Sequence, residues 1–172
     1  IDELLDQNIK RNDLVVVIGG GATGDGGAFV SSITLRGVDY IHVPTTLLAH
    51  DSAIGGKTAI NRPHGKNLVG TFYRPNAVIY DLDFFETLPE EEVPSGFGEI
   101  IKHAMLAGEE SITRLFDETK EGVDITRLNE FILYGIKTKM YYVSVDEKED
   151  NLRKFLNLGH TLGHALEYSF KL

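Results

Sequence analysis

A short apolar run followed at once by a glycine cluster is the feature that most constrains the fold of this chain. Residues 14–18 (LVVVI) are rich in β-branched side chains, which are typical of parallel strands covered on both faces. The glycine cluster precedes a helical stretch near residues 27–35 and a second strand at residues 39–43, which Pro44 closes. Strand, glycine turn, helix and strand together form a βαβ unit. The sequence therefore predicts an α/β fold at its N-terminal end.

The character of the sequence changes near residue 89. Before it, residues 58–72 are predicted to form a hairpin and residues 77–80 a further strand. The stretch from Pro89 to Pro94 holds three glutamates and marks the boundary. Helical patterns follow at about 96–107, 111–120, 126–145 and 151–170. We predict an α/β lobe at residues 1–89 and an α-helical lobe at residues 90–172.

Composition excludes several classes of protein. With 17 Lys and Arg against 26 Asp and Glu, the formal charge of −9 argues against nucleic-acid binding, which needs a basic face. No apolar run approaches the roughly 20 residues that span a bilayer, so we expect no membrane segment and a cytoplasmic protein. The absence of cysteine excludes disulfides and thiolate metal sites. Because the chain opens at Ile1 and stops at Leu172 within a predicted helix, we expect a piece of a longer protein.

The glycine cluster fits a phosphate-binding turn. Gly19, Gly21 and Gly24 satisfy G-x-G-x-x-G between a strand and a helix, where backbone can approach a pyrophosphate. A tight turn with no ligand is the alternative. An ordinary Rossmann site also has a carboxylate at the end of the second strand, but here that strand ends in Val43-Pro44-Thr45-Thr46. The turn is predicted to bind a phosphate-bearing cofactor whose adenosine is held differently.

Two lysines beside glycines flank the predicted hairpin. Lys57 follows Gly55-Gly56, Lys66 follows Gly65, and Asp51 and Asn67 lie close by in the sequence. Each lysine alone is compatible with a solvated surface charge. Together they indicate an anion pocket, because lysine offers a point charge to phosphate and asparagine offers neutral donors.

Glu99, Lys102 and His103 are spaced i, i+3 and i+4, so they share one face of a predicted helix. A surface salt bridge explains this spacing as well as a functional site does.

The last predicted helix carries a narrow polar stripe. If residues 151–170 form one α-helix, then Arg153, Asn157, His160 and His164 fall within about 60° of each other. Glycines 159 and 163 lie within that stretch, and each costs about 1 kcal/mol in a helix interior. This favours a polar cavity that a ligand approaches closely. The two histidines could bind one metal ion together with Glu99, or could be a pair of core histidines.

Six motifs, in their order along the chain, together resemble the 3-dehydroquinate synthase family, from about residue 14 to residue 167. They are Gly19-Gly20-Gly21 with Gly24-Asp25, Val43-Pro44-Thr45-Thr46-Leu47-Leu48, Gly55-Gly56-Lys57, Gly65-Lys66-Asn67, Gly98-Glu99-Ile100-Ile101-Lys102, and Asn157-Leu158-Gly159-His160-Thr161-Leu162-Gly163-His164. The resemblance implies an NAD-binding α/β lobe followed by an α-helical lobe, in an NAD- and Zn²⁺- (or Co²⁺-) dependent homodimer. It also implies a phosphate-releasing carbon–oxygen lyase of the shikimate pathway, which supplies aromatic amino acid biosynthesis. Such an enzyme converts 3-deoxy-D-arabino-heptulosonate 7-phosphate to 3-dehydroquinate by transient oxidation at C5, phosphate elimination, reduction and aldol cyclisation.

Matching positions carry the family's site residues onto this chain. The implied NAD contacts are Gly21, Ala22, Thr23, Gly24, Asp25, Thr45, Thr46, Lys57, Lys66, Phe84, Phe85, Glu86 and Thr87. The implied metal ligands are Glu99 and His160, which makes His164 a catalytic residue and not a ligand. The implied catalytic and substrate-contacting residues are Arg36, Asp51, Lys57, Asn67, Lys102, Lys139, Arg153, Asn157 and His164. Lys139 and Arg153 suit the substrate carboxylate, Lys57 and Asn67 its phosphate and hydroxyls, and Arg36 the partner subunit's site.

The resemblance is incomplete at both ends. The family's third zinc ligand, a histidine, is expected beyond Leu172, and the family's first strands are expected before Ile1. For these 172 residues alone we therefore predict weak NAD and zinc binding and no turnover. The alternatives are another NAD- and metal-dependent sugar-phosphate cyclase, a metal-dependent alcohol dehydrogenase of related fold, and a non-catalytic fragment.

Overall fold

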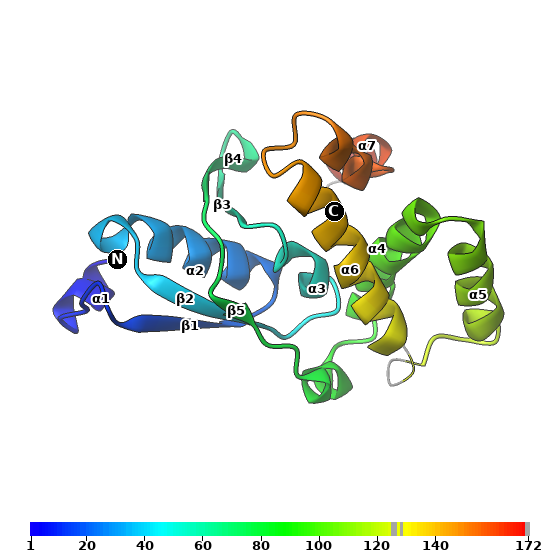
Figure 1. Ribbon diagram of the computed structural model, residues 1–172, viewed down its shortest axis with the longest axis horizontal. Helices are drawn as coiled ribbons and strands as arrows, with labels where there is room; N and C mark the ends of the chain where they lie inside the picture. Colours follow the sequence, from blue (N-terminus) through cyan, green and yellow to red (C-terminus); the bar gives the residue numbers. More distant parts are fainter. Residues whose placement is uncertain (125–126, 128, 171–172) are drawn as a thin grey trace.

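The computed structural model describes residues 1–124, 127 and 129–170, apart from the side chains of residues 164, 167 and 168. The α/β part comprises α1 (Asp2–Asp6), β1 (Leu14–Gly19), α2 (Gly21–Ile33), η1 (Thr34–Arg36), β2 (Asp39–Pro44), α3 (Ala49–Ser52), β3 (Lys57–Arg62), β4 (Gly65–Phe72), β5 (Ala77–Val78) and η2 (Leu82–Thr87). The helical part comprises α4 (Glu92–Ala107), α5 (Glu109–Thr119), α6 (Asn129–Val145), η4 (Leu152–Asn157) and α7 (His160–Phe170) (Figure 1).

The predicted βαβ unit is confirmed. β1, β2 and β5 form a parallel sheet in that order, and β1 pairs with β2 from Leu14↔Asp39 to Gly19↔Pro44. Helix α2 packs along one face of the sheet (Figure 1). The expectation that both faces of β1 are covered is wrong for the described residues. Leu14, Val16 and Ile18, which alternate along the strand, are 49%, 52% and 55% exposed.

Helix α2 begins at Gly21, earlier than the predicted residue 27, so the glycine cluster forms its first turns. Its glycines allow the helix to lie directly on the strands. A Cβ at Gly24 would overlap the imidazole of His42 on β2, and one at Gly27 would lie 2.6 Å from Cγ1 of Val17 on β1. The close approach therefore requires glycine at both positions.

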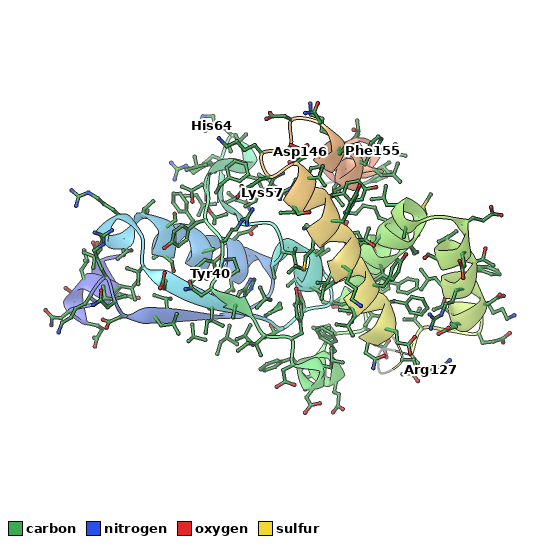
Figure 2. All side chains as sticks on the ribbon, viewed as in Figure 1. Tyr40, Lys57, His64, Arg127, Asp146 and Phe155 are labelled. Carbon is green, nitrogen blue, oxygen red and sulfur yellow. The ribbon has the colours of Figure 1, made fainter. Side chains whose placement is uncertain are left out.

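The predicted hairpin is also confirmed, with β3 and β4 antiparallel from Lys57↔Phe72 onward. Thr58 and Thr71 hydrogen-bond across it through their hydroxyls at 2.8 Å, and the Thr71 hydroxyl donates to Ser32 Oγ on α2 at 2.8 Å. These contacts fasten the base of the hairpin to α2, while His64 lies at its turn (Figure 2). The hairpin thereby forms one wall of the space between the α/β and helical parts.

The larger apolar core lies where the helical part packs against Leu47 and Phe85 of the α/β part. The buried residues of this core are Leu47, Phe85, Ile100, Ala104, Leu115, Phe131 and Ile132. The remaining α/β cluster is smaller and consists of Val17, Ala28 and Tyr40. No helix in the part of the chain that the structure describes is long and apolar enough to cross a membrane.

The prediction of one helix over residues 151–170 is wrong. The Asp146 carboxylate accepts hydrogen bonds from the main-chain N–H groups of Asp150, Asn151 and Arg153, which start the 3₁₀ helix η4. Gly159, at φ +84°, then turns the chain before α7. Arg153 and Asn157 therefore lie on a different element from His160, and the single polar stripe does not exist.

Candidate active site

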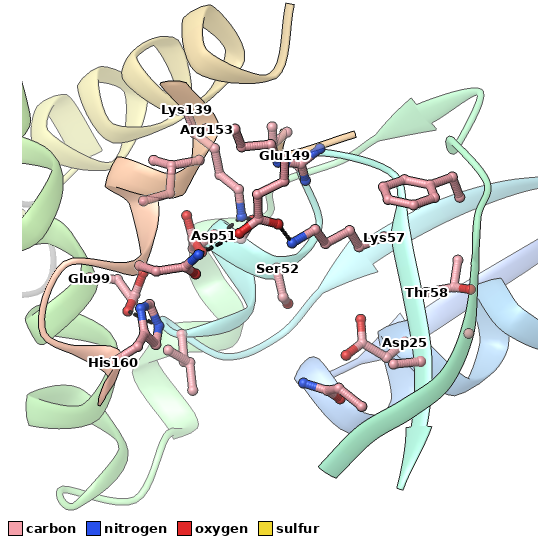
Figure 3. Close-up of a pocket in the computed structure, with 18 of the residues that line it drawn as sticks. Asp25, Asp51, Ser52, Lys57, Thr58, Glu99, Lys139, Glu149, Arg153 and His160 are labelled. Atoms are coloured by element: carbon pink, nitrogen blue, oxygen red, sulfur yellow. Dashed lines mark hydrogen bonds and ion pairs between the residues drawn. The ribbon is translucent and has the colours of Figure 1, made fainter. Parts of the chain in front are cut away.

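A cavity of about 660 Å³ lies between the hairpin and the helical part (Figure 3). Residues of α2, α3, β3 and β4 line one side, and residues of α4, α6, η4 and α7 line the other. The structure brings together ten of the predicted site residues as lining: Asp25, Asp51, Lys57, Asn67, Glu99, Lys102, Lys139, Arg153, Asn157 and His160. The broken last helix thus still delivers Arg153, Asn157 and His160 to one place.

Asp51, on α3, contacts side chains of the helices on the opposite side of the cavity. Lys139, which is 8% exposed, donates through Nζ to Asp51 Oδ2 at 2.8 Å and to its main-chain oxygen at 2.6 Å. His103 Nε2 lies 3.0 Å from the other carboxylate oxygen, although the two atoms are poorly aligned for a hydrogen bond. Burial opposes ionisation, but Lys139 and His103 outweigh it and hold the pKa of Asp51 well below its usual range. Asp51 is therefore an ionised acceptor at neutral pH.

Glu99 and His160 meet at the lower edge of the cavity (Figure 3). Glu99 Oε1 is 3.7 Å from His160 Nε2, and the second oxygen of Glu99 accepts a hydrogen bond from Lys102, which is 6% exposed. A carboxylate and an imidazole aimed at one point fit the nitrogen and oxygen donors that Zn²⁺ prefers. These two residues can therefore hold a divalent metal together with further donors.

Asp51, Glu99 and His103 form an alternative set of potential metal ligands. Donor atoms of Asp51, Glu99 and His103 lie within 4.8 Å of one another. The Lys139 ammonium group is bound to Asp51 and opposes a cation beside that carboxylate, whereas the Lys102–Glu99 ion pair is common to both candidate sites. We therefore favour Glu99 with His160.

Arg153 connects the two sides of the cavity. Its guanidinium is 3% exposed and donates to the Gly55 carbonyl at 3.1 Å and to the Glu147 carbonyl. Gly55 has φ +113°, and a Cβ there would lie 2.5 Å from the guanidinium. The Gly55-Gly56 turn is thus required for the contact between η4 and the loop before β3.

Glu149 is a site residue that sequence reasoning missed. Its carboxylate accepts from Lys57 on β3 and from Asn157 on η4, so it bridges the hairpin and the helices (Figure 3). Burial, Arg153 and Lys139 lower the pKa of Lys57 to about 8. The sequence does not single out Glu149, because it lies in an acidic stretch (DEKED) that is typical of a solvated loop.

The glycine turn lies outside the lining of the cavity, at the start of α2. The Thr45 N–H donates to the Gly19 carbonyl at 3.0 Å, and Thr46 packs against Gly20, so the predicted cofactor residues of the two βα turns are neighbours. Asp25, on the first turns of α2, lines the cavity, and burial raises its pKa to about 6. The N-terminal N–H groups of α2 offer donors for a phosphate at this end.

Other predicted residues lie away from the cavity. Arg36 is exposed after α2, and the cofactor residues that do not line the cavity are Gly21, Ala22, Thr23, Gly24, Thr45, Thr46, Lys66, Phe84, Phe85, Glu86 and Thr87. Phe85 is 2% exposed because its side chain packs in the larger apolar core. Only its backbone and the neighbouring predicted residues are therefore available to contact a cofactor. The side chain of His164 lies outside the described ones. The roles assigned to Arg36, to these cofactor residues and to His164 stay predictions.

Comparison with known families covers the whole chain. The family model described as 3-dehydroquinate synthase N-terminal matches residues 1–95, and that described as 3-dehydroquinate synthase C-terminal matches residues 96–172. Curated relatives named 3-dehydroquinate synthase are 55% identical in Staphylococcus carnosus and 51% identical in Staphylococcus aureus strain JH9. Each alignment covers 100% of this chain and 49% of the relative, so the chain spans about half the length of these proteins.

Solved structures give the same fold. A 2-deoxy-scyllo-inosose synthase complexed with carbaglucose-6-phosphate, NAD⁺ and Co²⁺ matches with a TM-score of 0.85 at 30% identity, over 98% of this chain and 48% of that one. A 2-epi-5-epi-valiolone synthase from Streptomyces hygroscopicus matches with a TM-score of 0.75 at 24% identity, over 92% of this chain and 46% of that one. The predicted α/β lobe followed by a helical lobe is therefore the architecture of this chain.

Proposed function

Because this chain belongs to the 3-dehydroquinate synthase family, we propose that it forms part of an enzyme that converts 3-deoxy-D-arabino-heptulosonate 7-phosphate to 3-dehydroquinate and phosphate. The observation that carries the proposal is the single 660 Å³ cavity. It combines the Glu99–His160 pair, four cationic side chains and Asp25 of the helix that follows the glycine turn.

The cofactors supply the redox and acid chemistry. When bound, NAD takes up and returns a hydride at C5, and a divalent metal acidifies the hydroxyl groups that it contacts. Glu99 and His160 would hold the metal, and the turn before α2 would hold the NAD phosphates. The solved relative with NAD⁺ and Co²⁺, at 30% identity, supports these two kinds of cofactor.

The protein side chains bind the substrate anion. Lys139 and Arg153 lie on the buried helical wall, where fixed acceptors orient them toward a carboxylate. Lys57 and Asn67 lie on the hairpin and face the phosphate and the hydroxyls. Glu99 bound to a metal would no longer neutralise Lys102, and this ammonium group would then face the substrate anion.

Phosphate release tests the proposal directly. The whole protein that contains this chain, given heptulosonate phosphate and NAD, is expected to release one phosphate per turnover without accumulating NADH. A chelator is expected to stop the reaction, and added Zn²⁺ or Co²⁺ to restore it. Net NADH formation with no phosphate release would instead indicate an alcohol dehydrogenase.

A second candidate function is that of another sugar-phosphate cyclase, favoured by the likeness to 2-deoxy-scyllo-inosose synthase. The pair Lys139 and Arg153 separates the two, because it suits a substrate carboxylate that sedoheptulose 7-phosphate lacks. Faster phosphate release from sedoheptulose 7-phosphate than from heptulosonate phosphate would favour this second candidate.

We also propose a cytoplasmic homodimer in which Arg36 reaches the partner subunit's site, as the family resemblance implies. Mixing inactive Arg36→Ala and His160→Ala proteins then regenerates one complete site in each mixed dimer. No recovery of activity after subunit exchange would contradict the shared site.

A further inference from the structure

We propose that His103, buried behind the cavity, is a positioning residue that holds the Asp51 carboxylate and, through it, the Lys139 ammonium group. The inference rests on the proposed function. His103 lies on α4, is 1% exposed, and is absent from the cavity lining, so it acts on the site through its neighbours.

The two oxygens of Asp51 face two different side chains. Oδ1 lies 3.0 Å from His103 Nε2, and Oδ2 accepts from Lys139 Nζ at 2.8 Å. A carboxylate turns easily about its last side-chain bond, because that torsion has broad energy wells. With the His103 imidazole against one oxygen and the Lys139 ammonium group bound to the other, Asp51 keeps one orientation, and Lys139 keeps the position that its contact with Asp51 defines.

His103 is itself held by contacts with two other helices. Its ring packs against Gly135 on α6, where a Cβ would lie 2.7 Å from Nδ1, and Gly135 is one helical turn before Lys139. The ring also meets His50 of α3 edge-on, with centroids 6.0 Å apart and planes at 87°. Burial lowers the pKa of His50, so this neighbour is uncharged near neutral pH. These contacts therefore hold the His103 imidazole in place beside the Asp51 carboxylate.

The experiment compares two substitutions in the whole protein. His103→Leu keeps much of the volume and removes the ring nitrogen that faces Asp51, whereas His103→Gln places an amide N–H near the position of Nε2. We expect His103→Leu to raise KM for the heptulosonate phosphate about tenfold with a smaller change in kcat, because Lys139 binds substrate. The Gln variant should return KM to within about threefold of wild type.

A double-mutant cycle tests whether His103 changes KM through Lys139. In a Lys139→Met background, His103→Leu should change KM by less than about twofold, because the group that it positions is gone. The matched control is His64→Leu, which removes an exposed histidine at the hairpin turn and should leave KM unchanged. If the Leu variant does not fold, His103→Asn replaces it, because its shorter amide cannot reach the Nε2 position.

The outcomes separate this inference from the proposed function. No phosphate release by wild-type protein overturns both. Normal wild-type kinetics with an unchanged KM in His103→Leu, or equal effects with and without Lys139, overturn the positioning role alone. Loss of bound zinc from His103→Leu also overturns it, because that result would place His103 in a metal site with Asp51 and Glu99.

Discussion

The two walls of the cavity present their cations in different ways. On the helical wall, Lys102, Lys139 and Arg153 are 6%, 8% and 3% exposed, and each donates to an acceptor of the protein. On the hairpin wall, the Lys57 side chain is 50% exposed and Asn67 is exposed. The helical wall is preorganised, whereas the hairpin depends on a few hydrogen bonds at its base. Substitutions should therefore damage folding and activity together on one wall, and activity alone on the other.

The largest effect is expected at the metal pair on the helical wall. His160→Ala removes one of the two facing donors, so bound zinc and phosphate release should both be lost, the latter by about 10³-fold or more. Metal analysis and the phosphate assay check this, with His64→Ala as the matched control. Full zinc occupancy in the variant would contradict the ligand assignment.

Lys139→Met is expected to have the next largest effect. It leaves the buried Asp51 carboxylate without its ion-pair partner, so we expect stability to fall by about 3 kcal/mol in addition to a large loss of kcat/KM. Chemical unfolding and steady-state kinetics measure the two effects. Lys137→Met, an exposed lysine on the same helix, should change neither. Unaltered stability of the Lys139 variant would remove the distinction between the walls.

Lys57→Met tests the hairpin wall. The side chain is half exposed, so stability should change by less than about 0.5 kcal/mol, while kcat/KM for the phosphorylated substrate falls about tenfold or more. Arg62→Met, at the far end of the same strand, serves as the control. A melting temperature lowered as much as in the Lys139 variant would show that the hairpin is as preorganised as the helices.

The smallest expected effect is a pH-dependent change in folding stability caused by Asp25, near the predicted cofactor-binding turn. Burial raises the pKa of Asp25 to about 6, so the ionised carboxylate costs stability in the folded state above that pH. Asp25→Asn should therefore be more stable than wild type at pH 7, by about 1 kcal/mol after allowance for solvent screening. The gain should vanish as pH falls from 6 to 4, where the wild-type carboxyl is protonated. Unfolding at pH 7 and at pH 4.5 checks the sign, and a variant less stable at pH 7 would refute it.

Much of the fold was predictable because it follows from local pattern. The parallel β1–β2 pair, the hairpin and the helices carrying Glu99 and Lys139 follow from apolar periodicity and turn residues. The last helix was mispredicted because its apolar pattern continues across Gly159, whose positive φ breaks the helix. Leu158 and Leu162 extend the apolar pattern across this position, and that pattern does not record the backbone φ of the residue between them.

By itself, the sequence determined the family and the α/β-then-helical order, and it supplied the candidate cationic and metal-binding side chains. Only the tertiary structure decided which of them share a cavity, that Glu149 joins the hairpin to η4, and that His103 lies under Asp51. The physical reason is that these contacts join residues tens of positions apart. Helix packing through Gly135 and the turn at Gly55 sets the distances between them, and no local propensity records those distances.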